Sequence, residues 1–259
     1  NSVSILLNNG NGTFRAKADY GLGQGPQALA VADFDGSGKP DLALAKVSKT
    51  LSVLLNNGDG TMAPRVDYAL GTGPYRIAVG DFDANGTPDL AIANSGDNTV
   101  SVLLNNGGGT FAARVNYATG TTPSGGVGVA DFDASGKVDI AVGNRADSTV
   151  SLLLNNGDGT FATKVDYAAG NAPVSLGVAD FDANAKPDLA VTNFSTNTVT
   201  VLLNGGGVPL FSNITYSTGA GAIALGVGDF NADGQVDFVE HNVGDGSAWV
   251  FTSPACNAP

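Results

Sequence analysis

Short runs in which apolar and polar residues alternate recur along the whole chain, separated by turns rich in Gly and Asn. Such alternation is typical of β-strands, and an Asn/Gly turn between two runs predicts a β-hairpin. The first hairpin covers residues 1–20. Related hairpins are predicted at Leu51–Tyr68, Val100–Tyr117 and Val150–Tyr167, and a weaker one, without the Asn-Gly-Asp-Gly turn, at Val199–Tyr216. No segment shows a helical period, so the sequence predicts an all-β protein.

Between hairpins, each repeat holds two further predicted strands joined by an acidic loop. A Gly-rich crossing leads into a strand of small residues, such as Ala28–Phe34, and the loop leads out into a second strand, such as Asp41–Ala45. The loops begin at Asp33, Asp81, Asp131, Asp180 and Asp229, spaced by 48 to 50 residues. Four-stranded units repeated at this spacing predict a β-propeller of about five four-stranded blades. The small residues suit an innermost strand, where neighbouring backbones crowd the axis.

A tyrosine stands at the same position near the end of every hairpin: Tyr20, Tyr68, Tyr117, Tyr167 and Tyr216. Aromatic residues in register can form a stacking platform for a ligand, but packing between blades is the commoner use of such large apolar rings. We therefore predict that these tyrosines pack between blades.

The two ends of the chain do not match perfectly. The third-strand motif occurs six times, near Val3, Val53, Val102, Leu152, Val201 and Val250, whereas acidic loops number five. The last repeat ends with the strand Ser247–Phe251 and lacks a fourth strand. We therefore predict a single domain, residues 1–259, in which the N-terminal hairpin 1–20 completes the last blade or pairs with a neighbouring chain.

The acidic loops follow the pattern D-x-[DN]-x-[SND]-[GA]-x-x-D, with oxygen-bearing side chains at alternate positions. Ca²⁺ binds such converging oxygens, and Gly at position six permits the turn. One such string is often only a surface turn, but five copies between apolar strands favour cation sites. The sequence predicts Ca²⁺ between blade strands one and two, with these ligands: Asp33, Asp35, Ser37, Asp41, Asp81, Asp83, Asn85, Asp89, Asp131, Asp133, Ser135, Asp139, Asp180, Asp182, Asn184, Asp188, Asp229, Asn231, Asp233 and Asp237.

The loops differ in how strongly they are expected to bind Ca²⁺. Those at Asp33, Asp81 and Asp131 combine three Asp with Ser or Asn and the Gly, so they should bind best. In the fourth loop Ala185 replaces the Gly, and a left-handed backbone costs a non-Gly residue roughly 1 kcal/mol. The fourth loop is therefore predicted to be the weakest or most distorted site.

Charge and composition agree with this chemistry. The formal net charge is −12, and 15 of the 23 aspartates lie in the five loops, so the acidity is mostly site chemistry. A basic stripe for nucleic acid and a run long enough for membrane insertion are both lacking. The single cysteine, Cys256, excludes an internal disulfide framework. The chain begins abruptly inside a repeat, as expected for a processed protein, and low charge with Thr/Asn/Gly richness favours a secreted or cell-surface location.

The repeats closely resemble the FG-GAP/VCBS repeat family, the propeller blades of integrin α-subunit heads, bacterial surface and secreted proteins and certain fungal lectins. The matching elements are Ala-Asp-Phe-Asp-Gly-Ser-Gly-Lys-Pro-Asp-Leu (32–42) with its four copies and Leu-Leu-Asn-Asn-Gly-Asp-Gly-Thr (54–61) with its relatives. The resemblance spans essentially the whole chain and implies Ca²⁺ in the loop between blade strands one and two. Familiar members mostly have seven blades, so five repeats depart from the pattern.

The leading functional prediction is a non-catalytic adhesion or glycan/protein-binding module. One alternative is a structural subunit of an extracellular fibre built by strand addition, with self-association through the N-terminal hairpin. Another is a non-catalytic or catalytic part of a polysaccharide-degrading enzyme. Catalysis needs a convergent acid/base set, and the chain holds one Glu and one His, adjacent as Glu240-His241. We read this pair as chance and expect no enzymatic activity and no catalytic residues.

The ligand, a glycan or an extracellular protein, is not specified by any motif. The most variable segments are the predicted loops between strands two and three and the inter-blade crossings, where Tyr75 is the one aromatic residue. Trp249, the single Trp, alternates with Val250 and is predicted to pack in the core or at the rim. Glycosylation sequons occur at Asn11, Asn85, Asn193 and Asn213, and a glycan on Asn85 would conflict with its role in a cation loop.

Overall fold

The computed structural model describes residues 1–207 and 210–252, and all regular secondary structure in these residues is β-strand. Five antiparallel sheets follow one another along the chain, which confirms the predicted class of about five propeller blades. Blade one comprises β3 (Pro26–Ala32), β4 (Asp41–Lys46), β5 (Thr50–Leu54) and β6 (Val66–Ala69). Blade two comprises β7 (Pro74–Gly80), β8 (Asp89–Asn94), β9 (Thr99–Leu103) and β12 (Val115–Ala118), with a ribbon of β10 (Asn105–Gly107) and β11 (Thr110–Phe111).

The remaining blades repeat this order. Blade three comprises β13 (Val127–Ala130), β14 (Asp139–Asn144), β15 (Thr149–Leu153) and β16 (Val165–Ala168). Blade four comprises β17 (Pro173–Ala179), β18 (Asp188–Asn193), β19 (Thr198–Asn204) and β20 (Phe211–Ser217). Blade five has three described strands, β21 (Ala222–Gly228), β22 (Asp237–Asn242) and β23 (Ala248–Phe251). A separate hairpin, β1 (Ser2–Ile5) with β2 (Ala18–Gly21), precedes blade one.

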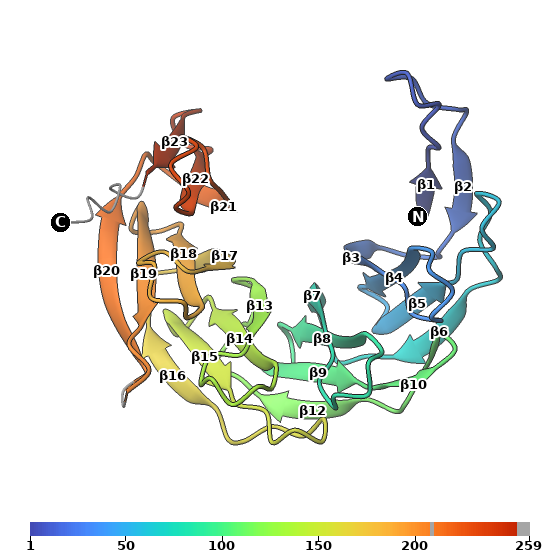
Figure 1. Ribbon diagram of the computed structural model, residues 1–259, viewed down its shortest axis with the longest axis horizontal. Helices are drawn as coiled ribbons and strands as arrows, with labels where there is room; N and C mark the ends of the chain where they lie inside the picture. Colours follow the sequence, from blue (N-terminus) through green and yellow to red (C-terminus); the bar gives the residue numbers. More distant parts are fainter. Residues whose placement is uncertain (208–209, 253–259) are drawn as a thin grey trace.

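The sheets stand side by side around an open arc, with the first strands of the blades on its inner side (Figure 1). Small residues occur on these strands because the next blade lies close. A Cβ added to Gly128 of β13 would lie 2.6 Å from Leu176 Cδ2 of β17. The second and third strands of the first four blades are almost wholly buried between neighbouring blades.

The core consists of layers between blades rather than one central cluster. Phe111 of blade two packs edge-on against Phe34 and Tyr68 of blade one, with ring centroids 5.6 Å apart in both pairs. Phe161 and Phe211 repeat this contact in the next two blades, with Tyr117 and Tyr167 as partners. The predicted inter-blade packing of these tyrosines is therefore confirmed. We call Phe111, Phe161 and Phe211 the key phenylalanines.

A buried Asn accompanies each key phenylalanine. The Asn105 side chain donates from Nδ2 to the carbonyl of Phe34, in the acidic loop of the preceding blade, at 2.9 Å. Asn155 donates to the Phe82 carbonyl at 2.9 Å and Asn204 to the Phe132 carbonyl at 2.7 Å. Since a buried amide and carbonyl must be paired, these bonds fix the position of each hairpin on the preceding blade.

The hairpin predicted at Val199–Tyr216 forms in blade four, and its ladder is longer than those of the other blades. Its sequence lacks the Asn-Gly-Asp-Gly turn, yet β19 and β20 form the longest outer ladder, from Thr198↔Ser217 to Asn204↔Phe211. In blades one and three the corresponding strands end earlier and an isolated bridge follows, such as Asn56↔Met62. The ladder is thus interrupted in the two hairpins with the Asn-Gly-Asp-Gly turn and continues in the hairpin without it.

The β1–β2 hairpin lies at one tip of the arc and blade five at the other (Figure 1). The hairpin packs on blade one through Val3, Tyr20 and the buried Leu22, which contact Leu44 and Leu54. It therefore covers the face of blade one that lies opposite blade two. Among the described residues β1 pairs with β2 and β23 pairs with β22. Completion of the last blade by the hairpin, within the chain or between chains, stays a prediction.

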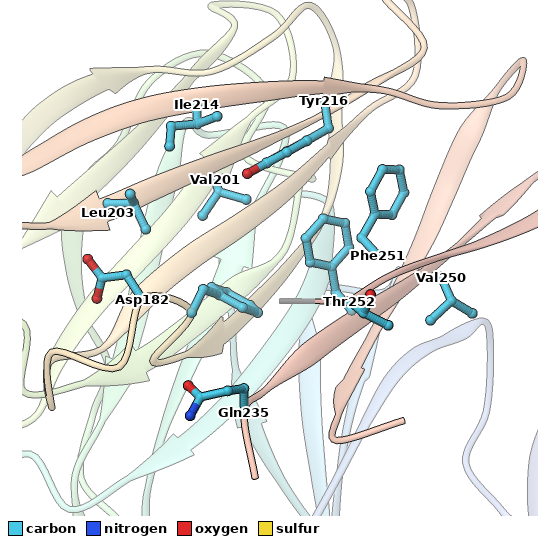
Figure 2. A pocket seen from close by; sticks show the side chains of 11 residues that line it. Asp182, Val201, Leu203, Ile214, Tyr216, Gln235, Val250, Phe251 and Thr252 are labelled. Carbon is cyan, nitrogen blue, oxygen red and sulfur yellow. The ribbon is translucent and has the colours of Figure 1, made fainter. Parts of the chain in front are cut away.

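The last blade leaves a cavity of about 560 Å³, lined by Phe181 and Tyr216 of blade four and by Phe238 and Phe251 of blade five. Figure 2 shows the side chains around this space, with Tyr216 beside Phe251, whose ring centroids lie 5.9 Å apart. Phe181 and Tyr216 correspond to the pair that holds a key phenylalanine in the preceding blades. In blade five Phe238 of β22 contacts both rings, with centroids 5.9 Å from Phe181 and 6.3 Å from Tyr216. Trp249 is 44% exposed and lies at the rim, where its ring stacks on that of Phe251 with the two centroids 6.2 Å apart.

Candidate metal centres and ligand-binding face

Each acidic loop is organised by backbone N–H groups that donate to its own carboxylates. In the first loop, Asp33 accepts from the N–H groups of Ser37 at 2.9 Å and Gly38 at 2.7 Å. Asp41, at the start of β4, accepts from Phe34 at 2.8 Å and from Asn56 of the next hairpin at 2.7 Å. Equivalent bonds to the first and ninth loop residues recur in the other four loops. The repeated spacing therefore produces one repeated geometry.

In four loops, three carboxylates converge, with one oxygen from each within 4.8 Å of the others. The groups are Asp33–Asp35–Asp41, Asp81–Asp83–Asp89, Asp131–Asp133–Asp139 and Asp180–Asp182–Asp188. Asn231 replaces the middle Asp in the fifth loop, and no such group forms there among the described residues. Asp229 nevertheless accepts from Gly234 N–H, so the loop keeps its shape.

The ninth-position carboxylates are the buried members of these clusters. Burial raises the pKa of Asp89 to about 6, and the charges of Asp83 and Asp81 add to the increase, although two backbone N–H groups lower it. Burial likewise raises the pKa of Asp139 to about 6 and raises the pKa of Asp188. Acidic groups held together against burial and mutual repulsion match a site in which a divalent cation supplies the missing positive charge. The converging oxygens therefore fit Ca²⁺.

The fifth-position side chains take a second role at the loop edge. Asn85 Oδ1 accepts from Thr87 N–H at 2.7 Å, while its Nδ2 donates to Asp83 Oδ2 at 3.0 Å. Asn184 makes the matching contacts with Lys186 and Asp182. These two side chains therefore stabilise the turn. The assignment of the fifth-position residues as ligands stays a prediction: Ser37, Asn85, Ser135, Asn184 and Asp233. The assignment of the other loop residues as ligands also stays a prediction.

The backbone of the fourth loop carries the expected strain. Ala185 has φ +65°, in the left-handed region. The sequence analysis did not predict a second left-handed residue, which stands at position four of every acidic loop. Ala84, Ala134, Ala183 and Ala232 have φ between +57° and +59°, whereas the first loop has Gly36 there. The fourth loop thus holds two left-handed alanines and the first loop none.

The end of the blades opposite the acidic loops carries a second candidate site. The first strands of blades two and four begin there, and the turns after the second strands meet them. A cavity of about 310 Å³ is lined by Tyr75, Arg76, Ser124, Arg145, Val174, Phe194 and Ile223. Arg145 and Phe194 belong to two of the variable loops singled out in the sequence, and Tyr75 is the aromatic residue of the crossings. The structure brings them together from separate blades.

Glu240 and His241 do not form a shared site. The Glu240 side chain is buried, with its Oε1 accepting from Asn242 Nδ2 at 2.5 Å, whereas His241 is exposed. Adjacent residues of a strand point to opposite faces of the sheet, so this carboxyl and imidazole face different surroundings.

The family model described as FG-GAP-like repeat matches five overlapping segments, residues 1–44, 33–92, 81–142, 131–191 and 180–240. Among curated protein sequences none matches the chain. Within the described residues, no helix has the length and apolar character needed to cross a membrane.

Several solved structures share the fold. An Agrocybe aegerita lectin, solved for its specific recognition of non-reducing terminal N-acetylglucosamine, is 21% identical with a TM-score of 0.63, over 98% of this chain and 75% of that one. Streptogramin B lyase is 16% identical with a TM-score of 0.57, over 91% of this chain and 71% of that one. The BBS1N chain solved in complex with ARL6DN is 14% identical with a TM-score of 0.57, over 88% of this chain and 66% of that one. The chain thus spans 66% to 75% of these proteins' lengths.

Proposed function

Because the chain belongs to the FG-GAP-like repeat family, we propose that it is a secreted or cell-surface, calcium-binding propeller that acts as a non-catalytic adhesion or glycan/protein-binding module. The observation that carries this proposal is the convergence of three carboxylates in each of four acidic loops. The lectin of similar fold supports a glycan as ligand, although at 21% identity the likeness concerns the fold. We do not expect nucleic acid as a partner of a chain of net charge −12, nor membrane insertion by a chain without a long apolar run.

Calcium would act here as a structural ion. Each cluster joins the turn after the first strand to the start of the second strand, and the ninth-position Asp also accepts from the next hairpin. An ion held by these oxygens ties the loop, the second strand and the hairpin together and removes the repulsion between the carboxylates. The end of the blades opposite the acidic loops then remains free to bind a ligand.

Titration of calcium into chelator-treated protein tests the metal part of the proposal. We expect heat of binding at several sites and a higher melting temperature, and a glycan array probed with the calcium-loaded protein should give binding that is lost on chelation. Absence of calcium binding would overturn the proposal. Calcium binding without any glycan or protein ligand would leave a structural role.

Such a role, as a fibre subunit, is the second candidate. The observation that favours it is the exposure of the last blade within the described residues, where Val250 is 54% exposed beside the 560 Å³ cavity. Phe14 of the N-terminal hairpin is 58% exposed at the position corresponding to the key phenylalanines. A hairpin from one chain could therefore pack on the last blade of another, by exchange of outer strands.

We also propose that the chain is not an enzyme, although the similar fold of a lyase keeps a polysaccharide-degrading activity as a third candidate. The separation of Glu240 and His241 onto opposite faces of β22 supports the non-enzymatic proposal. Measured turnover of a polysaccharide would contradict the proposal, and its loss or survival in His241→Ala would show whether His241 takes part.

A further inference from the structure

We propose that the cavity between Arg76, Arg145 and Phe194 binds an acidic saccharide, with the two guanidinium groups holding the sugar's carboxylate. This inference rests on the proposed glycan-binding function and names its site and its ligand class. We call the cavity, with its lining residues Tyr75, Arg76, Ser124, Arg145, Val174, Phe194 and Ile223, the arginine pocket.

Within the part of the chain that the structure describes, both arginines of the pocket lack an acidic partner. The chain holds 12 basic residues, and the ion pairs found in the described residues involve Lys17, Lys46, Arg65 and Lys164. Neither Arg76 nor Arg145 makes an ion pair or a side-chain hydrogen bond within residues 1–207 and 210–252. Two free guanidinium groups therefore converge on one cavity in a strongly acidic protein.

The guanidinium groups are positioned by aromatic rings rather than by carboxylates. Arg76 lies over the ring of Tyr75, with 5.0 Å from Cζ to the centroid, and Arg145 lies 6.0 Å from the centroid of Phe194. Stacking on a ring restrains the guanidinium while leaving its N–H donors unpaired. A carboxylate can then accept two parallel hydrogen bonds from one such fork.

The aspartates at this end of the blades are already engaged elsewhere. Asp97 accepts from Thr72 N–H at 2.6 Å, Asp147 from Thr121 N–H at 2.6 Å and Asp245 from Ala220 N–H at 2.9 Å. None of them lines the pocket. Each carboxylate closes its own inter-blade crossing, so the positive charge of the pocket is left for a ligand.

The size and lining of the pocket favour a sugar over a peptide. A volume of about 310 Å³ lies at the lower end of the range for ligand pockets, which suits one ring with its carboxylate. Val174 and Ile223 offer apolar contact for the C–H face of a sugar, and the Ser124 hydroxyl adds a polar group. Acidic saccharides such as uronic and sialic acids combine a carboxylate with such a face.

Calorimetric titration of the calcium-loaded protein with matched ligands tests the inference. The ligands are 3′-sialyllactose against lactose, and a glucuronate-terminated disaccharide against its glucose-terminated counterpart. We expect at least one acidic sugar to bind and its neutral counterpart to bind at least tenfold more weakly. Arg145→Ala and Arg76→Ala should each weaken binding by roughly tenfold or more, as expected for hydrogen bonds to a charged group.

Two further variants separate charge from geometry. Arg145→Lys keeps the charge but loses the bidentate fork, so it should restore only part of the affinity. Arg15→Ala removes an exposed arginine of the N-terminal hairpin, outside the pocket, and should leave binding unchanged. Unchanged melting temperatures of the pocket variants would show that they fold.

The possible failures are distinct. Equal affinity for acidic and neutral sugars, binding unaffected by both arginine variants, or binding of an Asp-rich peptide in place of every sugar would each overturn the inference. Neutral-glycan binding elsewhere on a calcium-loaded protein would leave the proposed function standing, whereas loss of calcium binding would remove the proposed function itself.

Discussion

At the residue scale, substitutions at the left-handed positions of the acidic loops can test backbone strain without a change in side-chain packing. Gly38 of the first loop has φ +76°, and a Cβ added there would meet nothing within 4 Å. Ala185 occupies the same position of the fourth loop with φ +65°. The effect of placing Ala at position 38 therefore comes from the backbone.

We predict that Ala185→Gly stabilises the protein by roughly 1 kcal/mol and tightens calcium binding at the fourth loop, because Gly adopts positive φ without the Cβ clash. Gly38→Ala should have the opposite effect of similar size in the first loop. Thermal melts and calcium titrations of both variants measure this. Changes of the same sign in the two variants would refute the ranking of the loops.

Glu240 offers a second test at this scale. Its Oε2 is buried with no hydrogen-bond partner among the described residues, and burial raises the pKa of the Glu240 carboxyl, with a smaller contribution from the charge of Asp245. A raised pKa in the folded state means that the native protein binds this proton more tightly than the unfolded chain. Stability from this group is therefore fully present below the unfolded-state pKa and is lost as pH rises through the folded-state pKa.

Glu240→Gln should accordingly raise the melting temperature at pH 7.5, because the amide keeps the contact to Asn242 and carries no charge. The difference from the parent chain should shrink as pH falls toward 4, where Glu240 is protonated in the native protein. A melting-temperature series from pH 4 to 8 checks this. A gain that is constant across the series would contradict the assignment of the effect to ionisation.

At the element scale, the outer hairpins of blades two, three and four are each held to the preceding blade by one ring and one amide. Asn155 is 6% exposed, and its Nδ2 donates to the Phe82 carbonyl at 2.9 Å and to the Val138 carbonyl at 2.8 Å. Its neighbour Asn156 is exposed and bonds within the turn to Thr160 at 2.9 Å. The two residues form a matched pair that differs in whether the bond crosses to another blade.

We predict that Asn155→Ala destabilises the protein by roughly 2–3 kcal/mol, since a buried carbonyl loses its donor. Asn156→Ala should change the free energy of unfolding by less than about 0.5 kcal/mol, as for most surface substitutions. Denaturant unfolding of both variants provides the measurement. Equal losses would mean that the turn, not the contact between blades, sets the stability of the hairpin.

At the scale of the whole molecule, the acidic clusters make stability depend on calcium. Four groups of three carboxylates lie in a chain of net charge −12. We predict that chelation lowers the melting temperature and that added calcium restores it. Each site held at a hundredfold excess over its Kd contributes roughly 2.7 kcal/mol. High salt should restore part of the stability of the chelated protein by screening its carboxylates. An unchanged melting temperature after chelation would show that calcium is not structural.

The N-terminal hairpin permits a second test at this scale. Deleting residues 1–20 removes the cover over Leu44 and Leu54, so we predict a lower melting temperature. Phe14→Asp alters a side chain that is 58% exposed and should leave the melting temperature of the monomer unchanged. If the hairpin joins chains, both changes reduce particle size in light scattering. A truncated chain as stable and in the same assembly state would show that the hairpin closes nothing.

The repeat, its strands and its acidic loops could be derived from the sequence alone. The alternation of apolar residues, the turn residues and the spacing of the loop aspartates are each encoded within about a dozen neighbouring positions. The loop that begins at Asp33 folds around its own carboxylates, so its shape follows from local sequence. Repetition then raised each local pattern above the level of chance, and the register of the tyrosines indicated packing between blades.

The tertiary structure alone decided what lies between repeats. Asn105 bonds to a carbonyl 71 positions away, and the arginine pocket joins Arg76, Arg145 and Phe194 from three blades. The repeat could not predict the arginine pocket, because Arg76, Arg145 and Phe194 depart from the residues at the same positions of the other repeats. The open arc and the cavity beside blade five were likewise absent from the pattern. Curvature accumulates from the packing of side chains of one blade against the next, and that packing depends on long-range contacts that local periodicity does not encode.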